Sequence, residues 1–339
     1  MNISFFDEKP NLDELDFKLP LLENYKNIDI NSMNNLLFYG LPACGKTMKI
    51  YALLASIFDK RVYDLKNITY EEDRKTIIYK ASIYHIEINP INLGSNEKLF
   101  IQGFLKSYIQ TRNIGLDIPK IILIKNAHQL TKQTQMALRK FVEKYTYTCK
   151  FIFEVNNLSC FLDALVSRCL LFRISLPKYE DIKLCIKNFS KRENVIIDDI
   201  MIDEIINESN KINNGYNLKK IFGYYRYYVL TNKKFIFLYY DKFFEILNYI
   251  NNKKISFIIL QKIRELVNEM YINLIPMEEL MLFLFYKISD SYKNDETFLY
   301  NFISLSAKCN TQLKKGNKEC LHIEYYIISI IELLHNNNK

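Results

Sequence analysis

A glycine-rich loop between an apolar run and a helix-like segment constrains this chain more than any other feature. Residues 36–39 are apolar strand formers, and the loop Gly40–Thr47 that follows has the spacing Gly-x-x-x-x-Gly-Lys-Thr. Such a loop holds phosphates on inward-turned backbone N–H groups when it follows a strand and opens a helix. Residues 46–58 carry apolar side chains at helical spacing, so both conditions hold. The sequence therefore predicts a nucleotide site in an α/β domain.

Each part of this loop has an expected role. Lys46 is expected to bridge the terminal phosphate oxygens, and Thr47 to place its hydroxyl on a magnesium ion. The cofactor is therefore expected to be ATP or ADP, with magnesium bound through the nucleotide. The loop residues assigned to cofactor binding are Gly40, Leu41, Pro42, Ala43, Cys44, Gly45, Lys46 and Thr47.

The second motif of nucleotide hydrolases has lost its acidic pair. A buried strand is predicted at residues 121–124, and such enzymes use carboxylates to hold magnesium and to orient the attacking water. Here Lys125 and Asn126 follow the strand, and His128 comes two residues later. A cation and an amide cannot do this work. We therefore expect the chain to bind nucleotide and to hydrolyse little or none of it.

The hydrophobic pattern divides the chain into three predicted domains. Strand-like and helix-like segments alternate through residues 1–175, which predicts a parallel sheet with covering helices. Residues 176–231 fit a small helical lid. Residues 232–339, with one Gly and one Pro, fit an all-helical domain. Its aromatic and aliphatic content favours packing against other chains, although an Ile- and Tyr-rich core of its own explains it equally well.

Within the first domain the strands and helices can be assigned by periodicity. Thr131 is a plausible N-terminal cap for the last helix. The predicted strands cover residues 36–39, 83–88, 121–124 and 151–155, and the predicted helices cover residues 46–58, 95–109 and 131–145.

Composition excludes several classes of protein. The net charge of +8, from 46 basic and 38 acidic residues, permits contact with a polyanion but does not require it. The seven Cys include no CxxC pair, which argues against a zinc site, and their odd number suits a reducing compartment. The first residues do not indicate a signal peptide, and we expect no membrane span because the longest apolar runs are too short for a bilayer. We expect an intracellular, soluble protein with no membrane partner.

Three further segments together resemble the clamp-loader branch of the AAA+ ATPases. They are residues 137–145, 149–157 and 166–169, and the last contains the Ser-Arg-Cys motif that marks replication factor C small subunits. In that family the arginine of this motif reaches the ATP of the neighbouring subunit. The resemblance implies that Arg168 acts in trans as an arginine finger, a role that suits a planar and permanently charged guanidinium.

Within the family, other segments are similar to the members numbered 3 in the human complex and 5 in the yeast complex. The resemblance covers essentially the whole chain. It implies that Asn156 senses the terminal phosphate and that Lys219 stands at the second sensor, where the family usually has Arg. Lys keeps the charge but lacks the bidentate fork. The similar segments are residues 84–90, 94–96, 312–318 and 321–324.

The resemblance also implies partners and a location. The third domain would act as a collar that joins other clamp-loader subunits into a hetero-oligomer. The assembly would load a sliding clamp onto primer–template DNA in the nucleus, during replication and repair. DNA contacts in this family go to the phosphate backbone, and the candidates here are Lys98, Lys106 and Arg139.

Two other functions stay open on the sequence alone. One is a self-sufficient P-loop ATPase of DNA metabolism, with an acidic residue elsewhere replacing the lost pair. The other is a scaffold subunit whose pocket is vestigial, against which the intact Gly40–Thr47 loop argues. ATP hydrolysis by the purified chain would support the self-sufficient ATPase. Failure of the chain to bind nucleotide would support the scaffold.

Overall fold

The structure divides into two compact units, Met1–Val229 and Leu230–Lys339. The second unit begins close to the predicted start of the collar, and the predicted division at residues 175 and 176 lies within the first unit and stays a prediction. The computed structural model describes residues 32–336 apart from residues 73–74, 98–99, 111–118, 194, 196, 210–216, 232–237, 252–256, 274 and 316–317.

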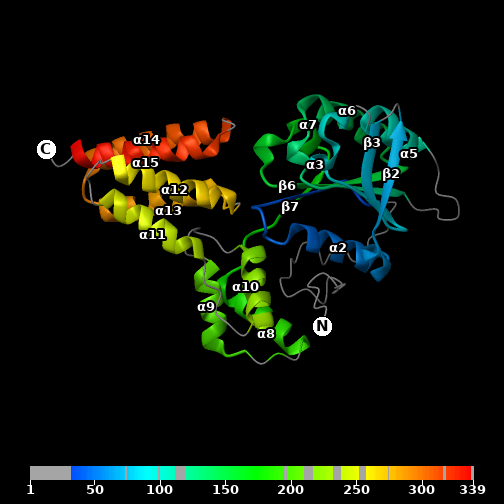
Figure 1. Ribbon diagram of the computed structural model, residues 1–339. Coiled ribbons are helices and arrows are strands. Elements are labelled where there is room, and N and C mark those ends of the chain that lie inside the picture. The colour runs from blue at the N-terminus through cyan, green and yellow to red at the C-terminus, as the bar shows by residue number, and fades with distance from the viewer. Residues whose placement is uncertain are drawn as a thin grey trace. The chain divides into compact units, whose positions relative to one another are not determined.

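The first unit is built on a seven-stranded mixed sheet (Figure 1). The strands β4, β5, β6, β1 and β7 are parallel neighbours, which confirms the predicted parallel sheet. The strands are β1 (Leu36–Tyr39), β2 (Lys66–Glu72), β3 (Lys75–Ala81), β4 (His85–Ile88), β5 (Lys120–Ile124), β6 (Cys149–Val155) and β7 (Leu170–Arg173), in the order β2-β3-β4-β5-β6-β1-β7.

The antiparallel hairpin of β2 and β3 at one edge of this sheet was not predicted. β3 pairs antiparallel with β4 over the register Lys80↔Glu87 and Ala81↔Ile86. Ile77 is fully buried in β3, whereas Ile78 is 49% exposed. An edge hairpin of this kind buries one face only, so its strands carry polar and charged side chains among the apolar ones and lack the continuous apolar runs of the central strands.

Helices cover both faces of the sheet. Helix α2 (Lys46–Ile57) packs on one face, and α3 (Pro90–Leu93), α5 (Lys106–Gln110), α6 (Lys132–Lys144) and α7 (Asp163–Val166) lie on the other (Figure 1). The side chains of each strand alternate between these faces. In β5, for example, Ile121 and Leu123 pack toward α2, while Ile122 and Ile124 pack toward the opposite face.

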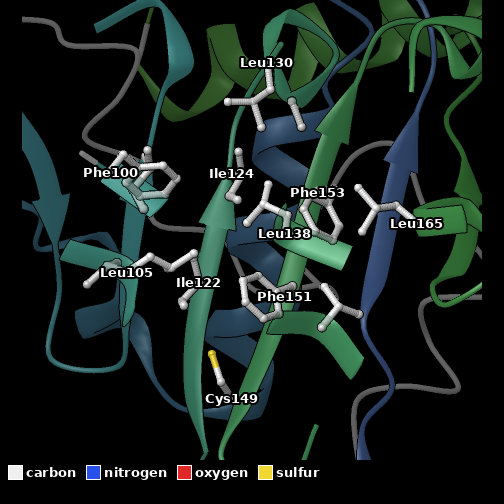
Figure 2. Packing of buried hydrophobic residues seen from close by; sticks show 14 of the residues in the cluster. Phe100, Leu105, Ile122, Ile124, Leu130, Leu138, Cys149, Phe151, Phe153 and Leu165 are labelled. Atoms are coloured by element: carbon white, nitrogen blue, oxygen red, sulfur yellow. The ribbon is translucent and has the colours of Figure 1, made fainter. Parts of the chain in front are cut away.

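The core beneath α6 fixes the central strands (Figure 2). Leu138 of α6 lies over Phe151 and Phe153 of β6, and all three side chains are fully buried. Thr131 caps α6 by accepting a hydrogen bond from the backbone N–H of Thr134, as predicted. The ends of β5 and β6 therefore stand on a rigid, close-packed platform.

One predicted helix is interrupted. The segment predicted as a helix over residues 95–109 forms a 3₁₀ turn at Gly94–Asn96, a π-helical segment η5 at Phe100–Leu105, and then α5. Gly94 has a φ of +51°, which breaks the helical path before residue 95. The remaining 3₁₀ turns are η3 (Lys60–Tyr63), η6 (Ala127–Gln129) and η7 (Leu158–Cys160).

All further elements in the described part of the chain are helices, which confirms the predicted helical C-terminal region. Fully buried side chains such as Phe243, Val267 and Ile330 form the interior of the second unit. Across the described residues, no helix combines the length and the apolarity needed to cross a bilayer. These helices are α8 (Tyr179–Arg192), α9 (Asp199–Ser209), α10 (Leu218–Thr231), α11 (Leu238–Asn251), α12 (Phe257–Ile272), α13 (Met277–Ser291), α14 (Glu296–Lys315) and α15 (Glu319–Asn336).

Candidate nucleotide-binding site

The loop Gly40–Thr47 connects β1 to α2 and has the tight backbone that its glycines predict. A Cβ atom added at Gly40 would lie 2.2 Å from the backbone oxygen of Ile174, so only glycine fits there. Gly45 has a φ of +90° and precedes the first residue of α2. The N-terminus of a 12-residue helix therefore opens at the loop, where its free N–H groups and its dipole favour a phosphate.

Lys46 is drawn into this loop. Its ammonium donates hydrogen bonds to the carbonyl oxygens of Gly40 and Leu41, both at 2.9 Å, and to Oδ1 of Asn156 at 3.0 Å. The residue is 4% exposed, and burial lowers the pKa of its ammonium, while the charge of Glu154 acts in the opposite direction. A buried cation beside a helix N-terminus is a strong electrostatic partner for phosphate.

The structure brings Asn156 and His128 together with Lys46. Asn156 follows the end of β6, and its backbone N–H donates to Nδ1 of His128 at 3.3 Å. The amide nitrogen of Asn156 also lies 3.3 Å from Nε2 of the same ring. Burial lowers the pKa of His128, and the positive charge of Lys46 lowers it further, which favours the neutral ring. A polar chain thus runs from Lys46 through Asn156 to His128.

The start of α10 closes the loop from another side. The backbone N–H of Leu218 donates to the carbonyl of Ala43 at 3.3 Å, and Asn217 caps the helix through the N–H of Lys220 at 3.2 Å. Lys219 is exposed at this point, and its charge contributes to the lowered pKa of Lys46. The sequence-predicted residues Lys46, Asn156 and Lys219 therefore come from three distant segments to one place.

Glu154 is a site residue that the sequence analysis missed. It precedes the end of β6 by one residue and accepts a hydrogen bond from the hydroxyl of Thr47, at 3.0 Å for Oε2 and 3.2 Å for Oε1. The residue is 8% exposed. The sequence analysis left open an acidic residue elsewhere in place of the lost pair, and Glu154 is such a carboxylate beside the loop. A signal was present: an acidic residue interrupts the apolar run of β6, on the same strand face as Ile152.

The residue that replaces the expected acid is neutralised by its surroundings. Lys125 follows β5, and its ammonium lies 2.7 Å from Oε1 of Glu87 on β4 and donates to the hydroxyl of Tyr51 at 2.9 Å. Tyr51 in turn hydrogen-bonds to Glu87. Burial, followed by the charge of Glu87, raises the pKa of the Tyr51 phenol, so this hydroxyl stays protonated. The cluster is a closed ion pair with a hydroxyl partner.

Arg168 is exposed on the segment between α7 and β7. Its Nη1 donates to the carbonyl of Ala164 at 2.7 Å and to the hydroxyl of Ser167 at 3.1 Å. Its Nε lies 2.7 Å from a carboxylate oxygen of Glu143, which also lies 3.4 Å from Nε of Arg139. The two arginines therefore share one exposed acidic partner on α6.

The remaining predicted DNA contacts are only partly described. Lys106 is exposed at the first position of α5, whereas Lys98 lies outside the described residues. Among the described residues, no group of three or more His, Cys, Asp or Glu side chains is arranged to hold a metal ion. A magnesium ion at this site would consequently need oxygens from the nucleotide as well as from the protein.

Part of the chain matches the model of a known protein family. The family described as "ATPase family associated with various cellular activities (AAA)" matches residues 36–177, which include the loop, Glu154 and Arg168. A protein of Acanthamoeba polyphaga mimivirus described as a replication factor C small subunit is 28% identical over 338 residues, covering 95% of this chain and 89% of that protein.

Replication factor C subunits of cellular organisms are also similar to this chain. Replication factor C subunit 5 of Saccharomyces cerevisiae is 25% identical, covering 88% of each chain. Replication factor C subunit 3 of Homo sapiens is 31% identical over 191 residues. That match covers 54% of this chain and 54% of the human protein, so the human likeness spans about half of each chain.

Proposed function

The chain is a replication factor C small subunit of the AAA ATPases, and from this premise we propose that it binds ATP or ADP with magnesium, hydrolyses little of it, and completes the ATP site of a neighbouring subunit. The assembly is a hetero-oligomeric clamp loader, in this proposal a pentamer. The observation that carries the proposal is an intact phosphate loop in the same sheet as strand β5, after which Lys125 and Asn126 stand in place of the acidic pair.

Low hydrolysis follows from the groups around the loop. A general base must accept a proton from water, and the amide of Asn126 cannot do so. His128 accepts a hydrogen bond at Nδ1 from the backbone N–H of Asn156, so its neutral ring carries the proton on Nε2 and has no free lone pair for a proton from water. Nucleotide in this pocket would then act as a structural ligand that holds the loop, α10 and Asn156 together.

The setting of Arg168 supports a role in trans. Its side chain is 39% exposed, and so is that of its partner Glu143. Exposed ion pairs of this kind contribute at most about 1 kcal/mol, so a phosphate on another subunit can take the guanidinium from Glu143 at little cost. The contacts to Ala164 and Ser167 meanwhile hold the side chain close to the end of α7, the helix that precedes it.

The second unit supports assembly with other subunits. Phe257 and Ile272, at opposite ends of α12, are 81% and 78% exposed. Exposed side chains of this size mark contact surfaces when they gather on neighbouring elements. Further exposed apolar residues of this unit are Ile258, Tyr271, Tyr300, Ile303, Leu321 and Tyr325.

The same proposal includes the sliding clamp, primer–template DNA and a nuclear location, in replication and repair. Lys106 and Arg139 are exposed cations that suit contact with a phosphate backbone, and the net charge of +8 favours such contact. DNA binding through them should be independent of base sequence and should weaken as salt is raised.

The test is ATP turnover by the assembled complex. The chain is co-expressed with its sister subunits, and Arg168→Ala is compared with wild type after isolation of the complex. A finger of this kind changes turnover at its site by about 1000-fold or more, so the complex should lose the contribution of one site while its assembly is unchanged. Arg168→Lys should not restore turnover, because Lys lacks the planar fork. Arg226→Ala, which removes an exposed arginine from α10, is the charge-matched control.

Four outcomes would contradict parts of the proposal. Unchanged turnover with Arg168→Ala would exclude the role in trans. A larger loss from Lys46→Ala than from Arg168→Ala would show that this chain's own site is catalytic. Magnesium-dependent hydrolysis by the purified chain alone would favour the self-sufficient ATPase, and failure to bind a fluorescent nucleotide would favour the scaffold.

A further inference from the structure

A carboxylate is missing after β5, but the neighbouring strand β6 carries one, Glu154, at the corresponding register position. β5 and β6 are parallel neighbours whose register ends at Ile124↔Phe153, so Lys125 and Glu154 are the next residues on each strand. Residues paired in this way project to the same face of a sheet. That face is covered by α2, since Thr47 and Tyr51 of α2 contact Glu154 and Lys125 respectively.

Glu154 therefore supplies the carboxylate that the expected motif would place at position 125. In nucleotide hydrolases with this loop, a carboxylate beside the Thr hydroxyl helps to hold magnesium. The hydroxyl of Thr47 donates to Glu154 at 3.0 Å, although Glu154 comes from the strand adjacent to β1 and not from β5. The cation of Lys125 is meanwhile paired with Glu87.

The pair Thr47 and Glu154 fits a hard cation. Magnesium prefers oxygen ligands and is usually bound by one or two carboxylates together with phosphates and waters. The Glu154 carboxylate is largely buried and accepts hydrogen bonds from the hydroxyl of Thr47, the group expected to face the ion. Glu87, the other buried acid on this face, is already occupied by Lys125 and Tyr51.

We propose that Glu154 is the carboxylate that holds the magnesium ion of the bound nucleotide together with Thr47, in place of the lost acid after β5. This inference rests on the proposed function, because it requires nucleotide in the loop Gly40–Thr47. The missing acidic motif normally provides both magnesium binding and the orientation of the attacking water, and this inference assigns only the first to Glu154. The chain keeps a metal-binding carboxylate and lacks the base that would orient water, so tight magnesium–nucleotide binding occurs without efficient hydrolysis.

The experiment measures nucleotide affinity and its dependence on magnesium. A fluorescent N-methylanthraniloyl-ADP is titrated with wild-type chain and with Glu154→Gln, once with excess Mg²⁺ and once with EDTA. The quantity compared is the ratio of the Kd in EDTA to the Kd in Mg²⁺. Losing one group that supports a metal typically weakens metal binding by about 10- to 100-fold, so this ratio should fall by a comparable factor in Glu154→Gln.

Glu87→Gln is the matched control. It removes the same charge from a buried glutamate on the neighbouring part of the same face, and its partner is Lys125. Both Kd values can change in this variant, because Lys125 is left without its anion, but their ratio should equal that of wild type. Thermal unfolding in EDTA checks that Glu154→Gln is folded, and Glu154→Asp, shorter by one methylene, serves if it is not.

The outcomes separate this inference from the proposed function. If wild type binds no nucleotide in either condition, the proposed function is wrong. If wild type binds nucleotide and the ratio is the same in Glu154→Gln as in wild type, within about twofold, the inference is wrong and the proposed function stands. Mn²⁺ titration in the presence of ADP, followed by electron paramagnetic resonance, gives a second readout that does not involve turnover: Glu154→Gln should leave more Mn²⁺ free, and an unchanged free fraction would also overturn the inference.

Discussion

Removing Lys125 should destabilise the first unit, although nucleotide hydrolases with this loop have an acidic residue at this position. Its ammonium lies 2.7 Å from Oε1 of Glu87, and the two side chains are 19% and 6% exposed. In Lys125→Met the carboxylate of Glu87 would keep its hydrogen bond from Tyr51 and lose the cation. A buried charge without its counter-ion is the situation in which large destabilisation is measured.

The magnitude follows from the distance and the burial. At an effective dielectric constant of about 20, two unit charges at this separation attract each other by about 6 kcal/mol. Desolvation of both groups offsets part of this attraction, and breaking a buried pair by removing one partner costs about 3–5 kcal/mol. Because Lys125 is about one-fifth exposed, we expect the lower end, a loss of about 3 kcal/mol in Lys125→Met.

The reciprocal and double variants give the interaction energy. Glu87→Gln should cost only about 1 kcal/mol, because the long side chain of Lys125 can extend its ammonium into water. The double variant Lys125→Met/Glu87→Gln leaves no unpaired charge and should cost about 1–2 kcal/mol. The coupling energy between the two residues should therefore be about 2–3 kcal/mol.

Native-state hydrogen exchange on the full chain is the suitable assay. The chain contains two compact units, so one global free energy of unfolding does not describe it. Exchange of the amides in β5 and β6 reports opening of the first unit alone. Additive effects, with a coupling energy below about 0.5 kcal/mol, would refute the view that Glu87 neutralises Lys125.

Two other perturbations test the site and its surroundings. Gly40→Ala should abolish binding of the fluorescent ADP and lower the thermal stability of the first unit, because its Cβ would lie 2.2 Å from the backbone oxygen of Ile174; binding with wild-type affinity would contradict this geometry. Stability should also fall below pH 6.5 through His85, whose pKa is lowered by burial to about 4 and whose Nε2 is buried without a hydrogen-bond partner in the described part of the chain. The unfolded chain binds this proton below about pH 6.5 and the folded chain only below about pH 4, so up to about 3 kcal/mol is lost across that window and none above it. His85→Phe should remove this component, which urea titrations at pH 7 and pH 4.5 would measure; an identical pH dependence in the variant would exclude the assignment.

The phosphate loop and the central strands could be predicted because their signals are local. The spacing from Gly40 to Thr47 lies within one short stretch of the chain, so it can be recognised without knowing which distant segments surround it. The strands β1, β5 and β6 are buried on both faces, so they appear in the sequence as mainly apolar runs. The hairpin of β2 and β3 lacks such a run because it lies at an edge of the sheet.

The tertiary structure alone decided which charges meet. Lys125 and Asn126 could be recognised from the sequence as a lost acidic pair, but neither the pairing of Lys125 with Glu87 nor the contact of Glu154 with Thr47 follows from spacing. Thr47 and Glu154 are 107 positions apart, and they meet because β6 lies next to β1 in the sheet and its register brings Glu154 level with the loop. Strand order and register depend on the packing of the whole domain, so the sequence determined which phosphate-binding groups exist, and the fold determined which carboxylate stands beside them.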